Sequence, residues 1–256
     1  MCPPTYFSIE YKINPWMKGE VDRGKAKCQW ETLKGTFEKL GMKISLIQPV
    51  KYLPDMVFTA DQGAIYDHIF IKSNFRNPER ARESLYTLNW FKKRGFTIVE
   101  LPEGAYFEGQ GDLLFFNSRI LVGVGQRTNL KAARIIQGLL REKPIILHLK
   151  DPFFYHLDTA LCVLPNQSLM VYEKAFDESS LKKIRKLAKH IVSLSKHDAS
   201  LMACDALVYQ NSIVINKGCS QSLLSNLRRL GVKTFEVELS EFLKSGGGVR
   251  ALTWEG

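Results

Sequence analysis

One stretch of the sequence decides the fold: Asp112-Leu-Leu-Phe-Phe-Asn-Ser-Arg-Ile-Leu-Val122. It opens with an aspartate and places two apolar runs on either side of a short polar break, which is typical of two strands joined by a tight turn. A helical pattern follows at residues 129–141, and a third apolar run lies at residues 144–149. We therefore predict a unit made of strand, strand, helix and strand (ββαβ).

The same unit occurs four times along the chain. Its leading residues are Asp61, Asp112, Asp158 and Asp205, which are 51, 46 and 47 positions apart. The polar breaks of the four hairpins are Asp67-His68, Asn117-Ser118, Asn166-Gln167 and Gln210-Asn211. The other helices are predicted at residues 78–94, after Asp177 and at residues 220–230, and the other closing strands at residues 96–101, 191–194 and 232–239. Self-similarity at a fixed period indicates an array of like units.

A fifth unit is predicted from the two ends of the chain. One more step of the repeat reaches residues 249–254, a strand candidate, while residues 43–48 also have a strand pattern. Just before residues 43–48, Trp30, Leu33, Phe37 and Leu40 have helical spacing and predict the helix of this unit. We predict a single α/β domain over residues 1–256, a five-bladed α/β propeller with pseudo-fivefold symmetry, whose closed ring leaves no sheet edge exposed. A doubly wound α/β sheet also fits the alternation of strands and helices.

Composition sets limits on the class of protein. The 256 residues are 45% hydrophobic and 24% charged, which is ordinary for a globular protein and excludes a disordered chain or a coiled coil. We find no apolar run near the ~18 residues of a membrane span and no signal peptide at the start. The five cysteines have no metal-ligand or redox spacing, so we expect reduced thiols in a cytoplasmic protein.

The charge of the chain is +10. The basic residues are spread over helical patterns such as residues 181–189, where they flank apolar positions as on a solvated helix face. No zinc pattern or RNA-binding signature accompanies them. We therefore expect neither a nucleic acid nor a membrane as partner.

A closed ring would bring the four leading aspartates to one end of a central channel. Several carboxylates around a small cavity suit a cationic ligand, because a desolvated charge requires an opposite partner. The alternative is that an aspartate before a strand is only a turn residue, and this applies most to Asp205.

Three segments near these aspartates contain candidate catalytic or ligand-binding side chains. Residues 54–61 hold Asp55 and Asp61 with Phe58 between them, and residues 107–112 hold Glu108 beside two glycines. His156 and Asp158 are two positions apart, and a histidine near carboxylates is the usual arrangement for general acid–base catalysis. The alternative for a single histidine is a structural role, which we expect of the other four. Residues 245–250 contain three glycines but lack the Lys-Ser/Thr of a P-loop, so they are interpreted as a turn.

Taken together, the motifs resemble those of the guanidino-group-modifying superfamily called penteins, which includes dimethylarginine dimethylaminohydrolases, arginine deiminases, amidinotransferases and arginine dihydrolases. The resemblance runs nearly end to end. The motifs that carry it are Met1-Cys2-Pro3-Pro4, Ile13-Asn14-Pro15-Trp16-Met17, Pro54-Asp55-Met56-Val57-Phe58-Thr59-Ala60, Glu108-Gly109-Gln110-Gly111-Asp112, Arg127-Thr128-Asn129, Asp151-Pro-Phe-Phe-Tyr-His156-Leu-Asp158-Thr159 and Gly246-Gly247-Gly248. The fold that this resemblance implies is the five-bladed α/β propeller.

The resemblance also implies a mechanism and a set of site residues. In the penteins a cysteine attacks the guanidinium carbon to form a covalent thiouronium intermediate, a histidine moves protons, and carboxylates hold the guanidinium nitrogens. Carried over by motif, His156 is the general acid–base with Glu108 beside it. The implied substrate contacts are Asp55, Asp61 and Asp158 as carboxylates, Phe58 as a pocket wall, and Asn14 and Arg127 at the amino-acid end. The expected ligand is arginine or a related guanidino compound, with no cofactor and no metal; a homo-oligomer is compatible with the family.

Two residues depart from the family pattern. Asp61 stands where arginine dihydrolases usually have asparagine, which favours a single-step hydrolase or a transferase. Ala251 stands where the family's Gly-Gly-Gly-x-x-Cys motif has its nucleophile, and neither Cys2 nor Cys162 aligns with that position. Ala251 is an engineered change, a natural loss that leaves an inactive guanidino-binding pseudoenzyme, or the sign of non-covalent, metal-assisted chemistry. We predict a protein of guanidino hydrolase or amidinotransferase lineage that is inactive because residue 251 is alanine.

Overall fold

Four small mixed sheets make up the β structure of this computed structural model, which describes residues 1–140 and 143–255. Each sheet has three strands: the first two form an antiparallel hairpin, and the third lies parallel to the second. A helix joins the second strand to the third, because parallel neighbours need a crossover connection. The predicted ββαβ unit is therefore confirmed four times.

The units follow one another along the chain. The strands are β1 (Gly63–Tyr66), β2 (Ile69–Lys72) and β3 (Thr97–Val99); β4 (Leu113–Phe116), β5 (Arg119–Val124) and β6 (Ile145–His148); β7 (Leu161–Leu164), β8 (Ser168–Val171) and β9 (His190–Ser193); β10 (Leu207–Tyr209), β11 (Ser212–Asn216) and β12 (Lys233–Val237). The crossover helices are α2 (Glu83–Lys92), α4 (Leu130–Leu139), α6 (Glu178–Leu187) and α8 (Gln221–Arg229). The last residue of the helix predicted at 129–141 lies outside the described residues.

The polar breaks form the hairpin turns. Asp67, Asn117, Asn166 and Gln210 have φ angles of 51°, 56°, 57° and 54°. This left-handed backbone is what tight hairpins require, and asparagine and aspartate tolerate it better than most residues.

The starts of three helices were also predictable from the sequence, since Asn129, Asp177 and Ser220 accept hydrogen bonds from the first-turn N–H groups of α4, α6 and α8. The helix predicted at residues 78–94 is divided into a 3₁₀ turn, η3 (Pro78–Arg80), and α2.

The fifth unit is only partly as predicted. Its helix is present as α1 (Arg23–Lys39), but the strands predicted at residues 43–48 and 249–254 are wrong, and the described chain contains no fifth sheet and no closed sheet. The cause at residues 249–254 lies in Asp205. Its carbonyl oxygen accepts the N–H groups of Val249 and Arg250, and its carboxylate accepts those of Gly248 and Ala251. These donors are therefore not free to pair with a strand.

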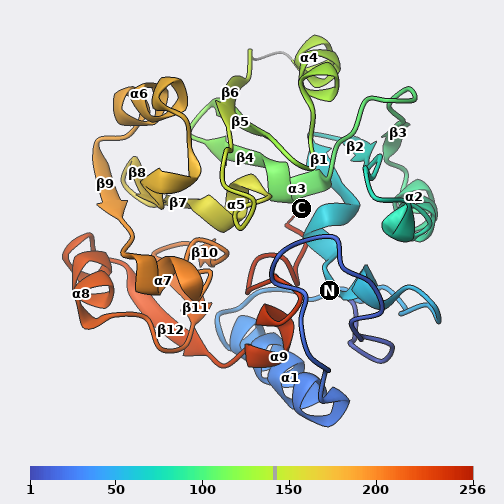
Figure 1. Ribbon diagram of the computed structural model, residues 1–256, viewed down its shortest axis with the longest axis horizontal. Helices are drawn as coiled ribbons and strands as arrows, with labels where there is room; N and C mark the ends of the chain where they lie inside the picture. Colours follow the sequence, from blue (N-terminus) through green and yellow to red (C-terminus); the bar gives the residue numbers. More distant parts are fainter. Residues whose placement is uncertain (141–142, 256) are drawn as a thin grey trace.

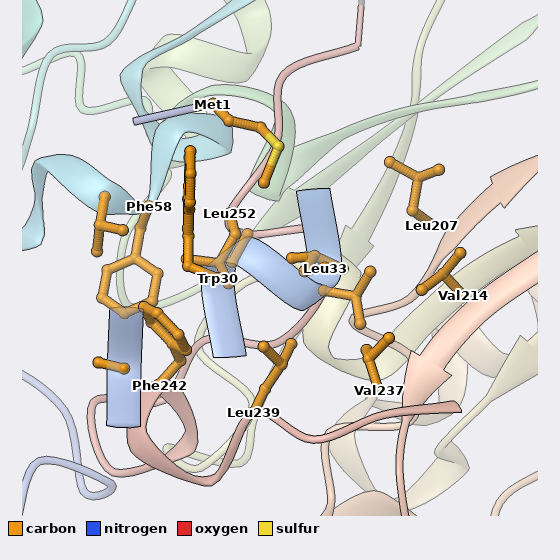
Figure 2. Packing of buried hydrophobic residues seen from close by; sticks show 14 of the residues in the cluster. Met1, Trp30, Leu33, Phe58, Leu207, Val214, Val237, Leu239, Phe242 and Leu252 are labelled. Atoms are coloured by element: carbon orange, nitrogen blue, oxygen red, sulfur yellow. The ribbon is translucent and has the colours of Figure 1, made fainter. Parts of the chain in front are cut away.

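The helices α1, α2, α4, α6 and α8 lie around the outside, and the sheets lie between them and the centre (Figure 1). The apolar face of α1 closes the arrangement. Trp30 and Leu33 of α1 pack against Leu207, Val214 and Val237 of the last sheet and against Leu252 near the chain end (Figure 2). Full burial of such side chains stabilises the fold by ~1.5–3 kcal/mol each. Residues distant in sequence are thus brought to the centre together.

Short helical turns lead into the first three hairpins. They are η2 (Thr59–Gln62), α3 (Gly109–Asp112) and α5 (Leu157–Ala160), and each contains one of the leading aspartates. A further 3₁₀ turn, η1 (Pro54–Val57), precedes η2. In the described part of the chain, no helix has the length and hydrophobicity needed to cross a membrane.

Candidate active site

The predicted site residues meet at one cavity. Eight of the nine line it directly: Asn14, Asp55, Phe58, Asp61, Arg127, His156, Asp158 and Ala251. The ninth, Glu108, lies behind them, in contact with both His156 and Arg127. Three of the leading aspartates, Asp61, Asp158 and Asp205, also line it, Asp112 contacts His156 from behind, and all four side chains are buried. The structure brings these residues together from units that are far apart in the sequence.

His156 is surrounded by three carboxylates. Its Nδ1 lies 3.1 Å from Asp112 Oδ2, and its Nε2 lies 3.6 Å from Asp61 Oδ1 and 3.5 Å from Glu108 Oε2. Burial alone would lower the pKa of His156, but the negative charges of Asp61, Asp112 and Glu108 outweigh burial and raise it from 6.5 to about 9. At neutral pH the imidazole is therefore protonated on both nitrogens and positively charged. Its Nε2 has no hydrogen-bond partner among the described residues.

Asp112 fixes the orientation of His156, a role that the sequence did not reveal. Its Oδ1 accepts the backbone N–H of Leu157 at 3.0 Å, and its Oδ2 accepts the hydroxyl of Thr128 at 2.6 Å. A carboxylate held at both oxygens keeps the Nδ1–H of the neighbouring imidazole in place. Gly111 makes room for this contact, since a Cβ there would lie 3.2 Å from the His156 ring.

Glu108 holds a guanidinium at the edge of the cavity. Its Oε2 accepts a hydrogen bond of 2.7 Å from Arg127 Nη1, and both side chains are buried. Arg127 also donates to the carbonyl of Ile13 at 3.2 Å and lies over the ring of Tyr155, 4.7 Å from its centroid. These contacts fix the position of Arg127 at the cavity wall.

Arg80 is a second buried guanidinium in the cavity, and sequence reasoning missed it. Its Nη1 donates to Asp61 Oδ2 at 2.6 Å, and its Nη2 donates to Glu83 Oε2 at 2.9 Å and to the carbonyl of Asp55 at 3.2 Å. Burial raises the pKa of Glu83 to about 7, although Arg80 opposes this shift. In the sequence, Arg80 sits in a helical pattern of mixed charge, between Glu79 and Glu83, and nothing distinguishes it from a solvated arginine.

Asp55 and Phe58 form another part of the wall. The hydroxyl of Tyr11 donates to Asp55 Oδ2 at 2.9 Å, whereas Asp55 Oδ1 has no partner among the described residues. Burial raises the pKa of Asp55, and Arg80 acts against it. The ring of Phe58 packs edge-on against Phe7, with centroids 5.5 Å apart. It also covers Gly247, where a Cβ would come within 2.2 Å of the ring.

Asn14 holds the N-terminal loop on the glycine turn. Its Oδ1 accepts the backbone N–H groups of Trp16 and Met17 at 2.9 and 3.2 Å, and its Nδ2 donates to the carbonyl of Ser245 at 3.0 Å. Both atoms of the amide are therefore engaged within the protein. Asn14 lies at the cavity, as predicted, through this turn.

Asp158 and Asp205 lie next to Ala251. Asp158 Oδ2 accepts a hydrogen bond of 3.2 Å from Arg250, while burial and then the charge of Asp205 raise the pKa of Asp158. Asp205 Oδ1 accepts the N–H of Ala251 at 2.8 Å, and burial raises the pKa of Asp205 to about 6. The second carboxylate oxygen binds Gly248, so Asp205 shapes the turn that presents residue 251.

Ala251 lies in the lining of the cavity, at the position predicted for the nucleophile. All five cysteines are unpaired: Cys2, Cys162, Cys204 and Cys219 are buried, and Cys28 is exposed. None of them is among the residues that line this cavity in the described chain. Burial also raises the pKa of Cys162 to about 12, which keeps it protonated. Over residues 1–140 and 143–255, no cluster of three or more His, Cys, Asp or Glu is arranged to hold a metal ion.

The chain is similar to proteins of a known family. A family model described as arginine deiminase matches residues 38–218. The chain belongs to the arginine deiminase family. Its membership confirms the resemblance to the penteins and a lineage of guanidino hydrolases. The fold is that of this family, an α/β arrangement of small mixed sheets.

Three relatives illustrate the likeness. The N(G),N(G)-dimethylarginine dimethylaminohydrolase of Mycobacterium tuberculosis is 37% identical over 257 residues, covering 100% of this chain and 84% of that protein. The N-terminal domain of ArgZ, a cyanobacterial arginine dihydrolase solved as a cysteine-to-serine mutant bound to substrate, has a TM-score of 0.96 and 36% identity over 99% of this chain and 96% of that one. A cysteine-to-alanine mutant of AgrE in complex with L-arginine has a TM-score of 0.95 and 34% identity, covering 98% of this chain and 39% of that one.

Proposed function

We propose that this member of the arginine deiminase family binds an arginine-like guanidino amino acid in the cavity between His156 and Ala251. One observation carries the proposal: buried carboxylates and buried guanidinium groups line the same cavity around His156. Asp55, Asp61, Asp158 and Asp205 supply the negative charge, and Arg80 and Arg127 supply the positive charge, paired with Asp61 and Glu108. A ligand that carries both a guanidinium and a carboxylate matches both kinds of charge.

Different side chains of the cavity would contact different parts of the ligand. We assign Asp61, Asp158 and Asp55 to the guanidinium and amino nitrogens, because charge-assisted pairs of guanidinium and carboxylate are strong and directional. The ring of Phe58 would form the wall along the aliphatic part. Arg127, together with Asn14, would hold the amino-acid end, while Arg80 holds Asp61 in place. The substrate-bound structure of the ArgZ domain supports a small guanidino ligand for this fold.

The chemistry follows from the proton on His156. With a cysteine thiolate at position 251, the sulfur would attack the guanidinium carbon, and the protonated imidazole would give its proton to the departing amine. Water, losing a proton to the now neutral His156, would then attack the thiouronium carbon, release the thiolate and restore the protonated imidazole. An amine acceptor in place of water would make the reaction an amidino transfer. Asp61, where arginine dihydrolases usually have asparagine, favours a hydrolase that releases one amine, or a transferase, over a dihydrolase.

As written, the chain has no nucleophile at position 251 and would bind the ligand without covalent turnover. The complex of the cysteine-to-alanine mutant of AgrE with L-arginine supports binding of this kind without one of the thiols. The protein is then an inactive guanidino-ligand binder built on a hydrolase site. We further propose that α1 and its flanking segments stand as the fifth unit of a propeller. A cytoplasmic location and a homo-oligomeric state remain predictions.

The test compares the protein with its Ala251→Cys variant. Calorimetric titration with arginine, dimethylarginine and agmatine measures binding, and assays for ammonia, citrulline, ornithine and methylamines measure turnover. We expect both proteins to bind a guanidino ligand and the cysteine variant alone to turn it over. Turnover by the alanine protein would contradict the thiol mechanism. Absence of binding by both folded proteins would overturn the proposed function.

A further inference from the structure

A second cavity, of about 490 Å³, lies between the first and last sheets. Its walls come from β1, from β10, and from residues 42–47 and 253–255, which overlap the two segments predicted to be strands of the fifth unit, residues 43–48 and 249–254. Trp90, near the end of α2, and Arg94, just beyond that helix, also contribute. The cavity thus occupies the place where a fifth sheet was expected. Its volume is in the range of small-molecule sites in proteins, ~300–1,000 Å³.

The walls of this cavity are largely apolar. They include Ile44, Ile65, Val208, Trp90 and Trp254. None of these residues belongs to the guanidino cavity, whose lining is mostly charged or polar. An apolar concavity of this size on a globular protein marks a binding surface more often than a chance gap. The ligand that fits it has an apolar body.

Two positive charges stand among these walls. Lys43 and Arg94 are exposed, and neither forms an ion pair with another described residue. The guanidinium of Arg94 lies flat on Trp90, 3.4 Å from the ring centroid, which holds it in place. The acidic residue in the lining, Glu255, is already paired with Arg250 at 3.2 Å. The excess charge of the cavity is positive, so it favours an anion.

An unpartnered hydroxyl also belongs to this lining. Thr59 is 1% exposed, and its Oγ1 has no hydrogen-bond partner among the described residues. Buried hydroxyls nearly always have a partner, in the protein or in a bound molecule. The position of Thr59 in the cavity wall indicates a polar atom of a guest as that partner.

We propose that this cavity is a second ligand site for an apolar monoanion, an aromatic or aliphatic carboxylate or sulfonate. The apolar body packs between Ile65 and Val208, and the anionic head pairs with Lys43 and Arg94. Thr59 supplies a hydrogen bond inside. The guanidino ligand cannot use this site, since its positive charge would face Lys43 and Arg94.

The two cavities share one short segment. Phe58 and Asp61 line the guanidino cavity, and Thr59 between them lines the second one. Ala60 donates its N–H to the carbonyl of Ala251 at 3.2 Å, which ties the segment to the glycine turn. A guest that contacts Thr59 therefore acts on the segment that carries Asp61. This coupling rests on the proposed function, whereas binding in the second cavity does not.

The probe for the second cavity is 8-anilinonaphthalene-1-sulfonate, an apolar anion that fluoresces when it leaves water. We expect saturable binding at one site per chain. Val208→Trp fills the cavity and should weaken binding at least tenfold, as should Arg94→Glu. Arg229→Glu is the matched control, because it reverses an exposed charge at the end of another outer helix and should leave binding unchanged. Thr59→Val, which keeps the shape of the side chain, serves if Val208→Trp does not fold.

Binding that all folded variants share equally with the parent protein would overturn the proposal. Equal loss in Arg94→Glu and Arg229→Glu would also overturn it, since that result would mean attraction by overall charge. Arginine titrations with and without the probe test the coupling separately: we expect a severalfold change in arginine affinity. Unchanged arginine affinity would refute the coupling. If arginine does not bind at all, the proposed function fails, while the probe titration still decides the second site.

Discussion

Asp112 Oδ2 lies 3.1 Å from Nδ1 of His156, and the same carboxylate is fixed by the N–H of Leu157 and the hydroxyl of Thr128. Only Nδ1 of the imidazole is therefore hydrogen-bonded among the described residues, and Nε2 faces Asp61 and Glu108 without a hydrogen bond. This arrangement sets both the orientation and the charge of the residue to which we assign proton transfer.

Replacing Asp112 should lower the pKa of His156. The native imidazole should titrate near pH 9. In Asp112→Asn a negative charge and a charge-assisted hydrogen bond are lost, so we expect a decrease of about one unit or more, equivalent to ~1.4 kcal/mol per unit. The imidazole proton shifts of the two proteins, followed by NMR against pH, measure it. Asp67→Asn, in an exposed hairpin turn, is the control; an unchanged His156 titration in Asp112→Asn would contradict the assignment.

His156 should make stability depend on pH in a defined window. Its folded-state pKa of about 9 lies above the ordinary 6.5, so protonation stabilises the folded state. This contribution is fully present below pH 6.5 and is lost as the pH rises toward 9. We expect the difference in unfolding free energy between the protein and His156→Gln to shrink by roughly 3 kcal/mol between pH 6 and pH 9.5. Urea unfolding at the two pH values measures this, and a constant difference would disprove the raised pKa.

Gly247→Ala should destabilise the protein by ~1–3 kcal/mol, because the added methyl meets the Phe58 ring, with a Cβ distance of 2.2 Å. Gly138→Ala is the matched control. Gly138 lies in α4, a Cβ there has nothing within 4 Å, and alanine favours helix by up to about 1 kcal/mol. Denaturant midpoints of the two variants should therefore move in opposite directions. A Gly247→Ala protein as stable as its parent would show that the glycine turn is not held by Phe58.

Arg80→Met should cost ~3–5 kcal/mol of stability, because it leaves Asp61 and Glu83 buried without their cation. Adding Glu83→Gln removes one of those unpaired charges and should restore part of the loss. Thermal and urea unfolding of the single and double variants measure this difference. If the double variant folds, its arginine titration should show weakened binding, since Asp61 has lost the guanidinium that holds it in place. Equal stability of the single and double variants would mean that the ion pair with Glu83 contributes little.

The fold was predictable where the signals are local. Hairpin turns show as short polar breaks such as Asn117-Ser118, and helix starts show as capping residues such as Asp177. The absence of a strand at residues 249–254 could not be predicted, because it depends on Asp205. The carbonyl and carboxylate of Asp205 accept hydrogen bonds from the N–H groups of residues 248–251. No pattern within residues 249–254 reports a contact made so far away in the sequence.

The candidate site shows the same division. Motif residues such as His156, Asp61 and Glu108 were recognisable, and the structure places them together. Arg80 was not, because a buried arginine and a solvated one have the same local sequence; only its contacts with Asp61 and Glu83 distinguish it. Asp112 appeared in the sequence as the start of a repeat, and its role toward His156 became visible only in three dimensions.

The position of α1 has a consequence for how the chain is made. The buried face of α1 packs on Leu207, Val214 and Leu252, which follow it by more than 150 residues (Figure 2). During synthesis the helix therefore emerges long before its partners exist, whereas each ββαβ unit can assemble as soon as its own strands appear. Contacts of such long sequence separation form late and leave apolar surface uncovered in the interval. Trp30 and Leu33 must therefore stay free of contacts with other molecules until residues 207–252 have left the ribosome.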